Sequence, residues 1–460
     1  MLDLEQLLAG ERDHPAALAE AHINPAFVKC LKLLGFDKRY ARAQGAYLYD
    51  DAGNRYLDCL VGYGTFACGR NHPVIRQTIK QAMDLDLPNL LHMGIPSLSG
   101  LLARELLKVA PRGLETVFFT SSGSEGVETA LKYARAATGK KRIIHCNKSF
   151  HGLTFGALSV NGHTQFKEGF GPLLPSVTQI PYSDLPALAR ELTLDDVAGF
   201  IVEPIQGEGV FMPHDDFLPG ALELCRKHGV VFIADEVQTG LGRTGKMFAC
   251  EHWGIAPDIL ISAKALSGGY VPVGAVLSRR WIHDKVFSSL DRSVVHSSTF
   301  SENDLAMAAG LATLHVLQDE QLVENAASLG DLLAHGLREV GQKYEMFREV
   351  RGRGLMLGIE FGPPRSKTLK MGWNLLHKLN PSLFCQVMLI PLLSEHRILA
   401  QVAGHDIDVI KLMPALVITE EDVAHLVRAF DQVLAASHRF PGPVWEMSKR
   451  FAGSAMRLSG

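Results

Sequence analysis

The chain has 460 residues, with 46 lysine and arginine residues against 49 aspartate and glutamate residues, and a formal net charge of −3. Hydrophobic residues make up 47% and charged residues 21%, a composition that is ordinary for a folded globular protein and excludes disordered and collagen-like classes. The near-neutral balance also argues against a nucleic-acid binder, which needs a basic face to displace phosphate counterions.

Seven cysteines are scattered along the chain, and none belongs to a Cys-x-x-Cys pair. Their odd number and spacing argue against a disulfide framework or a zinc site and favour a reducing compartment. The longest apolar run, residues 383–393, is shorter than the ~20 residues that a membrane span needs. The first residues lack the apolar run of a signal peptide. We expect a cytoplasmic protein with no metal, membrane or nucleic-acid partner.

Residues 1–45 predict a charged helical entry segment, and residues 46–59 predict a hairpin. Short apolar runs then alternate with stretches of helical spacing. The runs that predict strands are 116–120, 142–146, 199–202, 230–234, 259–262 and 273–278, and the stretches that predict helices include 125–137, 219–228, 305–317, 322–340 and 423–434. Strand–helix alternation is typical of an α/β fold with a mostly parallel sheet.

Residues 240–246, Gly-Leu-Gly-Arg-Thr-Gly-Lys, match the dinucleotide-binding pattern Gly-x-Gly-x-x-Gly and most of a P-loop. Neither match has the neighbouring residues that the motif needs in order to bind a nucleotide. Met247 follows the lysine where a P-loop needs Ser or Thr, and residues 235–238 separate the glycines from the preceding strand. We interpret the segment as a glycine-rich loop that shapes a pocket wall.

Three segments place chemistry-bearing residues at predicted strand ends. Residues 120–125, Thr-Ser-Ser-Gly-Ser-Glu, open a helix, where free N–H groups and hydroxyls form an anion cradle. Asp235 ends an apolar strand, and a carboxylate there can keep a ring nitrogen protonated. Lys264 follows another apolar strand, where desolvation would make it a Schiff-base nucleophile. Each segment alone also fits an ordinary role, as a helix cap, a solvated acid or a surface charge.

Together these features meet the requirements of pyridoxal phosphate (PLP). Six motifs occur in order between residues 46 and 433: SSGSEGVETALKYAR, FHGLTFGALS, VEPIQGEGV, IADEVQTGLGRTG, PDILISAKALSGG and HSSTF. On these motifs the sequence resembles the class III aminotransferases, the ornithine- and 4-aminobutyrate-type enzymes of fold type I. The resemblance is greatest to the putrescine/ornithine-type and amine transaminases.

The resemblance implies an α/β fold with a large domain, whose mostly parallel sheet is flanked by helices, and a smaller α+β domain from both chain ends. Residues 1–80 would form the N-terminal part of the small domain, 81–330 the large PLP-binding domain and 331–460 the C-terminal part. It also implies a homodimer with shared active sites.

Site residues follow from the same resemblance. Lys264 would hold PLP covalently and carry the reacting proton, while Asp235 pairs with the pyridine nitrogen. The other residues expected to bind the cofactor are Gly123 and Ser124 at its phosphate, Phe150 on its ring, Gln238 at its phenolic oxygen and Thr299 at the phosphate of the neighbouring subunit. Glu203 lies in a motif near the substrate, and we take His151 as a packing residue.

Two positions depart from the amino-acid-specific members. Leu153 and Lys411 stand where an arginine is usual, and neither can form arginine's bidentate fork with a carboxylate. We therefore expect a ping-pong transamination with a primary amine, diamine or ω-amino acid as donor and a 2-oxo acid such as pyruvate or 2-oxoglutarate as acceptor. The residues assigned to the substrate are Tyr63 and Phe66 as an apolar wall, Leu153, Glu208 at a distal ammonium and Lys411 at the acceptor carboxylate.

Alternatives stay open at this point. Tyr63 and Phe66 also fit core packing, and Glu208 fits a structural ion pair. The chain could be an ornithine, acetylornithine or 4-aminobutyrate aminotransferase, or an aminomutase, racemase or decarboxylase on the same fold. A non-catalytic PLP-binding protein is a further class, against which the presence of both Lys264 and Asp235 argues.

Overall fold

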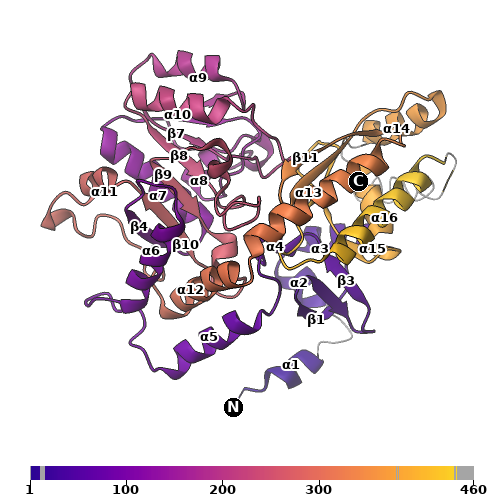
Figure 1. Ribbon diagram of the computed structural model, residues 1–460, viewed down its shortest axis with the longest axis horizontal. Helices are drawn as coiled ribbons and strands as arrows, with labels where there is room; N and C mark the ends of the chain where they lie inside the picture. Colours follow the sequence, from indigo (N-terminus) through magenta and orange to yellow (C-terminus); the bar gives the residue numbers. More distant parts are fainter. Residues whose placement is uncertain (1, 11–15, 380, 382, 440–441, 443–460) are drawn as a thin grey trace.

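The computed structural model of the chain describes residues 2–10, 16–379, 381, 383–439 and 442. Its largest sheet has seven strands in the order β4-β10-β9-β8-β7-β5-β6 (Figure 1). The strands are β4 (Thr116–Thr120), β5 (Arg142–Cys146), β6 (Val177–Ile180), β7 (Val197–Val202), β8 (Val231–Asp235), β9 (Ile259–Ser262) and β10 (Gly274–Ser278). The pairs from β9 to β6 are parallel, and β10 runs antiparallel to both of its neighbours. The predicted α/β class is therefore confirmed.

Strand β8 shows why helices cover both faces of this sheet. Val231 and Ile233 belong to an apolar cluster with residues of α7 (Gly123–Thr138), whereas Phe232 and Ala234 belong to a second cluster with residues of α10 (Phe217–Lys227). Side chains alternate along a strand, so a continuously apolar strand must be buried on both faces. The sheet is thus held between two helical layers, and only its edges and strand ends can face solvent.

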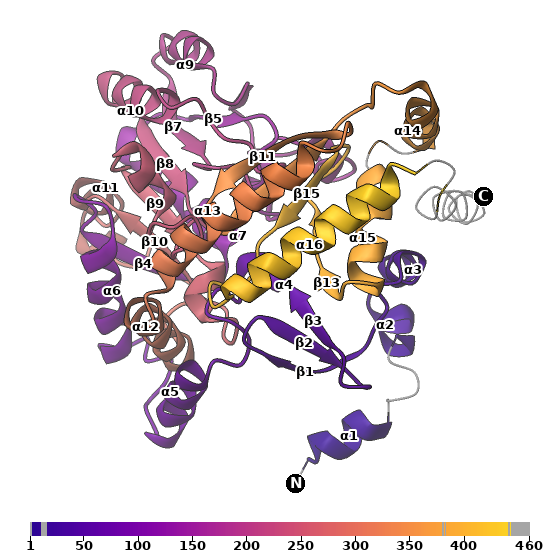
Figure 2. The ribbon, with the colours of Figure 1, turned by 45° about the vertical axis from the view of Figure 1, so that its right-hand side comes forward.

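There are two smaller sheets, one of which joins strands from both ends of the chain. One contains β1 (Tyr40–Gln44), β2 (Tyr47–Asp50), β3 (Arg55–Asp58) and β13 (Ile398–Leu399), and the other contains β11 (Phe347–Arg353), β12 (Met356–Phe361), β15 (Val409–Leu412) and β14 (Gln401–Val402). Strand β13 pairs in parallel with β3, although more than three hundred residues separate them. Figure 2 shows α13 (Leu322–Gly341) and α16 (Glu420–Ser437) side by side over this part of the molecule.

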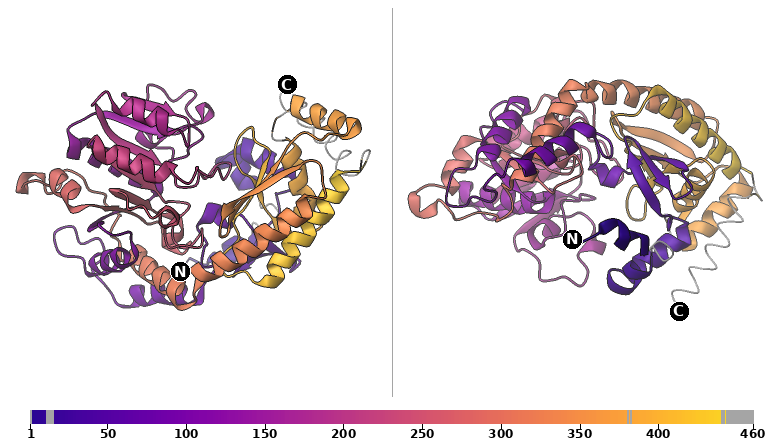
Figure 3. Two further views of the ribbon diagram at one scale, coloured as in Figure 1. Left: turned by 45° about the horizontal axis from the view of Figure 1, so that its top comes forward. Right: turned by 90° about the horizontal axis from the view of Figure 1, so that it is seen from below.

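The other helices surround these sheets. They are α1 (Leu4–Gly10), α2 (Ala17–His22), α3 (Pro25–Leu34), α4 (Val61–Gly64), α5 (Pro73–Asp84), α6 (Ser97–Val109), α8 (Phe155–Ser159), α9 (Leu185–Leu192), α11 (Arg280–Val286), α12 (Asp304–Asp319), α14 (Lys367–Leu379) and α15 (Leu383–Ser394), with short 3-10 turns η1 (Thr164–Phe166), η2 (Ala249–Trp253), η3 (Lys264–Ser267) and η4 (Leu290–Arg292). Figure 3 shows α12 and α13 linking the large sheet to the part that holds the smaller sheets. Among the described helices, none has both the length and the apolar character that crossing a bilayer requires.

The sequence predictions agree with these elements except at two strands. Residues 1–45 were expected to be helical, but Tyr40–Gln44 forms β1, because it pairs with β2 of the hairpin; residues 1 and 11–15 of that segment lie outside the described residues. The predicted strands and helices coincide with β4, β5, β7–β10, α7, α10, α12, α13 and α16 to within a few residues, and β2 and β3 form the predicted hairpin. Strand β6 was not predicted, because Val177–Ile180 is short and contains two polar residues. The predicted boundaries near residues 80 and 330 stay a prediction.

The glycine-rich segment 240–246 forms turns and opens no helix. Its Arg243 is almost fully buried, and the guanidinium donates to the carbonyl oxygens of Leu355 and Pro414. The loop therefore connects the end of the large sheet to the C-terminal part of the chain, in keeping with a structural role.

Candidate functional site

A cavity of about 550 Å³ lies at the carboxyl ends of the large sheet's strands, the edge where open α/β sheets bind ligands. Glu203 follows β7, Asp235 ends β8, and Lys264 follows β9. The opposite wall comes from β14, β15 and their connection, which contributes residues 401–405 and Lys411. The site therefore combines the large sheet with a sheet formed from the C-terminal part of the chain.

The N-terminus of α7 forms one end of the cavity. Ser122 caps the helix by accepting a hydrogen bond from the Glu125 N–H at 3.2 Å, and Gly123 and Ser124 begin its first turn, where N–H groups have no acceptor within the helix. A Cβ on Gly123 would lie 2.9 Å from a Val237 methyl group, so only glycine keeps this approach open. Free amides, a hydroxyl and the positive end of a helix dipole suit an anion.

Asp235 is fixed at the centre of the site. Its side chain is buried, Oδ1 accepts from the Val237 N–H at 3.0 Å, and Oδ2 lies 2.7 Å from Nδ1 of His151. The interpretation of His151 as a packing residue is corrected, because its imidazole orients the carboxylate. Its position directly after Phe150 in the FHG motif was the available signal, yet only the fold shows that it meets Asp235, 84 residues away.

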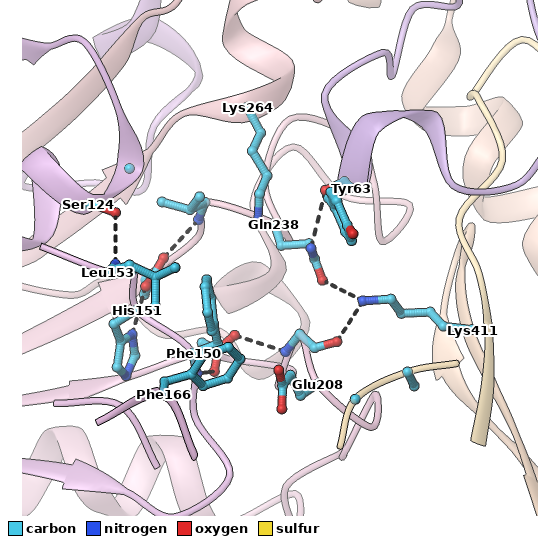
Figure 4. Close-up of a pocket in the computed structure, with 18 of the residues that line it drawn as sticks. Tyr63, Ser124, Phe150, His151, Leu153, Phe166, Glu208, Gln238, Lys264 and Lys411 are labelled. Carbon is cyan, nitrogen blue, oxygen red and sulfur yellow. Dashed lines mark hydrogen bonds and ion pairs between the residues drawn. The ribbon is translucent and has the colours of Figure 1, made fainter. Parts of the chain in front are cut away.

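Lys264 is partly buried and extends into the cavity toward Gln238 (Figure 4). Burial lowers its pKa below the usual value, while the nearby carboxylates of Asp235 and Glu203 act in the opposite direction. Its φ of 43° lies in the left-handed region, which is sparsely populated for residues other than glycine. Such strain is typical of functional positions, and a lysine with a lowered pKa has more of the nucleophilic neutral amine.

Glu203 organises the cavity floor. Its oxygens accept from the N–H groups of Phe150 at 3.0 Å and Gly207 at 2.8 Å. Burial raises the pKa of Glu203 to about 7. The ring of Phe150 meets that of Phe166 edge-on at 5.3 Å between centroids, and Phe150 lines the same cavity as Asp235.

Lys411 is buried on the opposite wall with neutral partners. Its Nζ donates to the Gly207 carbonyl at 2.8 Å and to Oε1 of Gln238 at 3.2 Å. The amide nitrogen of Gln238 in turn donates to the Tyr63 carbonyl at 3.2 Å. Burial, with a further contribution from Lys264, lowers the pKa of Lys411 to about 7. Figure 4 shows Gln238 between Tyr63 and Lys411.

Glu208 also lines the cavity and lies between two histidines. Its Oε2 is 2.9 Å from Nε2 of His163, and its Oε1 is 3.8 Å from Nδ1 of His405. The ion-pair contact anticipated as an alternative for Glu208 is therefore present, with His163 as its nearer partner.

The structure brings most of the predicted residues together and leaves two apart. Tyr63 and Leu153 line the cavity, and both side chains are more than half exposed. Phe66 does not line it, because its ring packs beneath the Arg70 guanidinium, 4.1 Å from the centroid, and against Gly269. Thr299 is exposed and also lies outside the cavity lining.

An anion cradle, a fixed buried carboxylate, a partly buried amine and an aromatic face thus surround one cavity. This set matches a ligand with a phosphate, a basic ring nitrogen and a carbonyl carbon. The residues present therefore fit PLP.

Comparisons with known proteins agree with this geometry. Residues 36–434 match the family model described as aminotransferase class-III. The chain is 41% identical over 355 residues to a putrescine aminotransferase of Pectobacterium atrosepticum, covering 74% of this chain and 75% of the relative. It is 36% identical over 443 residues to aminotransferase PigE of a Serratia strain, covering 89% of this chain but only 52% of that longer relative.

A solved structure shows the same fold. The chain superposes on an ornithine aminotransferase from Toxoplasma gondii, described with partial occupancy of PLP at its active site, with a TM-score of 0.79. The two are 30% identical, and the match covers 94% of each chain.

Proposed function

The chain belongs to the class III aminotransferase family, and on this premise we propose that it moves an amino group from a primary amine or a diamine to a 2-oxo acid. Members of the family are PLP-dependent aminotransferases. The observation that carries the proposal is the pairing of the partly buried Lys264 amine with a cavity whose described lining contains no arginine. The following roles are part of the proposal.

Lys264 would hold PLP covalently through Nζ, and Gly123 and Ser124 would hold its phosphate. When bound, PLP supplies an acceptor for the electron pair left as the substrate carbon loses its proton. Asp235, oriented by His151, would keep the ring nitrogen protonated, and Phe150 would cover one face of the ring. When not bound to the cofactor, the Nζ amine of Lys264 would accept the proton from the substrate carbon and would donate it to the cofactor carbon on the other side of the transferred nitrogen.

The substrate side of the cavity favours donors without an α-carboxylate. Leu153 has no polar group, and Lys411 is a point charge whose protonation is disfavoured by burial. A carboxylate entering with the donor would therefore find no bidentate partner. The carboxylate of the 2-oxo acid acceptor must still be bound. We assign this contact to Lys411, which lines the wall opposite the large sheet.

An apolar hollow beside the cavity supports amines with a hydrocarbon body. It has a volume of about 400 Å³ and is lined by Leu153, Phe155, Leu158, Gln165, Phe166 and Phe170. Leu153 and Phe166 also line the main cavity, so the two spaces adjoin. A putrescine aminotransferase among the relatives fits the same class of donor.

A second copy of the chain would complete the site. Exposed apolar side chains gather in two segments, at 85–95 and 290–300; they are Leu85, Leu91, Met93, Ile95, Leu290, Val294, Val295 and Phe300. Large exposed apolar surface marks an interface. Thr299 lies in the second segment, so the predicted contact of Thr299 with the neighbouring subunit's phosphate requires this surface to be the dimer interface.

A donor panel tests the proposal. The purified protein with PLP is assayed with putrescine, alkyl amines, ornithine, acetylornithine and 4-aminobutyrate, with pyruvate or 2-oxoglutarate as acceptor and alanine or glutamate as the measured product. We expect the highest kcat/KM for diamines and alkyl amines. Higher values for the amino acids would refute the donor class while leaving the family assignment intact.

A further inference from the structure

The Glu208 carboxylate joins two distant parts of the chain at the substrate cavity. His163 directly precedes η1, whereas His405 and Asp406 belong to the connection between β14 and β15. The nearer contact is to Nε2 of His163 at 2.9 Å. A second contact beside it, from the Gln165 amide to Asp406 at 3.0 Å, joins the same two segments. Glu208 and His405 line the cavity, whereas His163 contacts Glu208 without lining the cavity itself.

We propose that His163 is a specificity-determining residue that competes with the distal ammonium of a diamine donor for the Glu208 carboxylate. The inference rests on the proposed function, because the donor must enter with its reacting amine at Lys264. Glu208 and Lys264 line the same cavity, so a donor chain that extends from Lys264 along this wall runs toward the carboxylate. The distal ammonium of a diamine can pair with that carboxylate, whereas a monoamine of the same length has no second ammonium.

The charge on His163 decides whether Glu208 is available. A protonated imidazole neutralises the carboxylate, whereas a neutral imidazole leaves a net negative charge facing the cavity. The contact with the Glu208 carboxylate raises the pKa of His163 above its usual value, while burial acts in the opposite direction. Protonation of His163 therefore persists to higher pH than for a free histidine.

Other charged groups around the His163–Glu208 pair also influence it. Lys148 lowers and Asp406 raises the pKa of His163, and His405 lies 3.8 Å from the second oxygen of Glu208. Lys411, with a pKa near 7, interacts with Glu208 from the opposite wall. Because Lys411 also titrates, with a pKa of about 7, a pH profile of the wild type alone does not identify His163, and a variant of His163 is needed.

The experiment compares two donors of equal length. The ratio of kcat/KM for 1,4-diaminobutane to that for butylamine is measured at pH 6 and pH 9, where both donors remain largely ammonium, with the wild-type holoenzyme and with His163→Gln. In the wild type the ratio should rise between pH 6 and pH 9. In His163→Gln the ratio at pH 6 should exceed the wild-type ratio about tenfold, the value of one charge-assisted hydrogen bond, and at pH 9 the two proteins should agree.

Three further variants define the outcome. Glu208→Gln should lower the ratio at both pH values, and His335→Gln, at an exposed histidine paired with Glu339 on α13, should behave as the wild type. A His163→Gln protein with the wild-type ratio at pH 6 would overturn the proposal. So would an effect that appears in His405→Gln instead. If no amine donor reacts with any 2-oxo acid, the proposed function itself fails, which is a different result.

Discussion

The two walls of the cavity treat buried charge in opposite ways. On the cofactor side, the Asp235 carboxylate is held between a backbone N–H and the His151 imidazole. On the substrate side, the Lys411 ammonium is buried against a carbonyl and an amide oxygen, with no carboxylate within hydrogen-bond distance among the described residues. Burial of a charge without an opposite charge is costly, which explains the lowered pKa of Lys411. The first wall is built for one fixed charge state, and the second can change its charge near neutral pH.

The largest effect is expected from a substitution on the cofactor side of the cavity. Lys264→Ala should leave a folded protein that binds PLP without a covalent bond, while turnover falls by about 10⁴-fold or more, because both the nucleophile and the proton carrier are lost. Turnover is measured by product formation, and the covalent bond by borohydride trapping and peptide mapping.

Lys108→Ala, at an exposed lysine of α6, is the control and should match the wild type in both measurements. Trapping of PLP on another lysine would refute the assignment of Lys264.

Asp235→Asn tests whether the charge of this side chain matters in addition to its size. The amide keeps the size of the carboxylate but removes the charge that holds a ring nitrogen protonated, so kcat should fall by about 10²–10³-fold. PLP should still bind, which absorbance of the bound cofactor can follow. A kcat near the wild-type value in this variant would mean that another group keeps the ring nitrogen protonated. The control is Asp331→Asn, at an exposed aspartate of α13, which should match the wild type.

Lys411→Met tests the variable charge of the second wall. Below a pKa of about 7 the wild-type lysine is charged and can pair with the acceptor's carboxylate, and above that pH it becomes neutral. The KM of the wild type for a 2-oxo acid should therefore rise from pH 6 to pH 9. The variant should have a KM about tenfold above the wild type at pH 6 and a smaller difference at pH 9.

Lys411→Arg tests the same contact with a charge that does not change, since arginine stays charged throughout this pH range. Its KM for the acceptor should depend less on pH than that of the wild type. An acceptor KM that is independent of pH in the wild type would show that Lys411 does not bind the carboxylate.

The smallest expected effect is a shift in donor preference. Leu153→Arg places a guanidinium on the cavity wall at the position where the sequence resemblance led us to expect an arginine, and the exposed position tolerates the longer side chain. The kcat/KM ratio of ornithine to putrescine should rise several-fold, by the value of one surface ion pair or slightly more. Leu332→Arg, at a partly exposed leucine of α13, should leave the ratio unchanged.

Local patterns in the sequence predicted the cofactor side well. Asp235 ends β8, Lys264 comes two residues after β9, and the Ser-rich start of α7 follows β4. In a mostly parallel sheet these strand ends necessarily meet at one edge. The order of local elements therefore predicts which residues converge, and the family motifs add their roles.

The substrate side was predicted less completely, because its contacts join residues far apart in the chain. Phe66 and Tyr63 lie three residues apart and appeared equivalent, yet only Tyr63 lines the cavity, while Phe66 packs under Arg70. The pairing of Glu208 with His163 carries no local pattern that distinguishes it from ordinary packing, because the two residues are 45 positions apart in the chain.

The sequence by itself determined the α/β class, the strand ends that carry Asp235 and Lys264, and the lack of arginine at positions 153 and 411. Only the tertiary structure decided the charge behaviour of Lys411, whose hydrogen-bond partner Gln238 lies 173 residues away. The physical reason is that side-chain type and hydrophobic period are local properties, readable along the chain. A pKa and a hydrogen-bond partner instead depend on burial and neighbours, which exist only after β14 and β15 have packed against the edge of the large sheet.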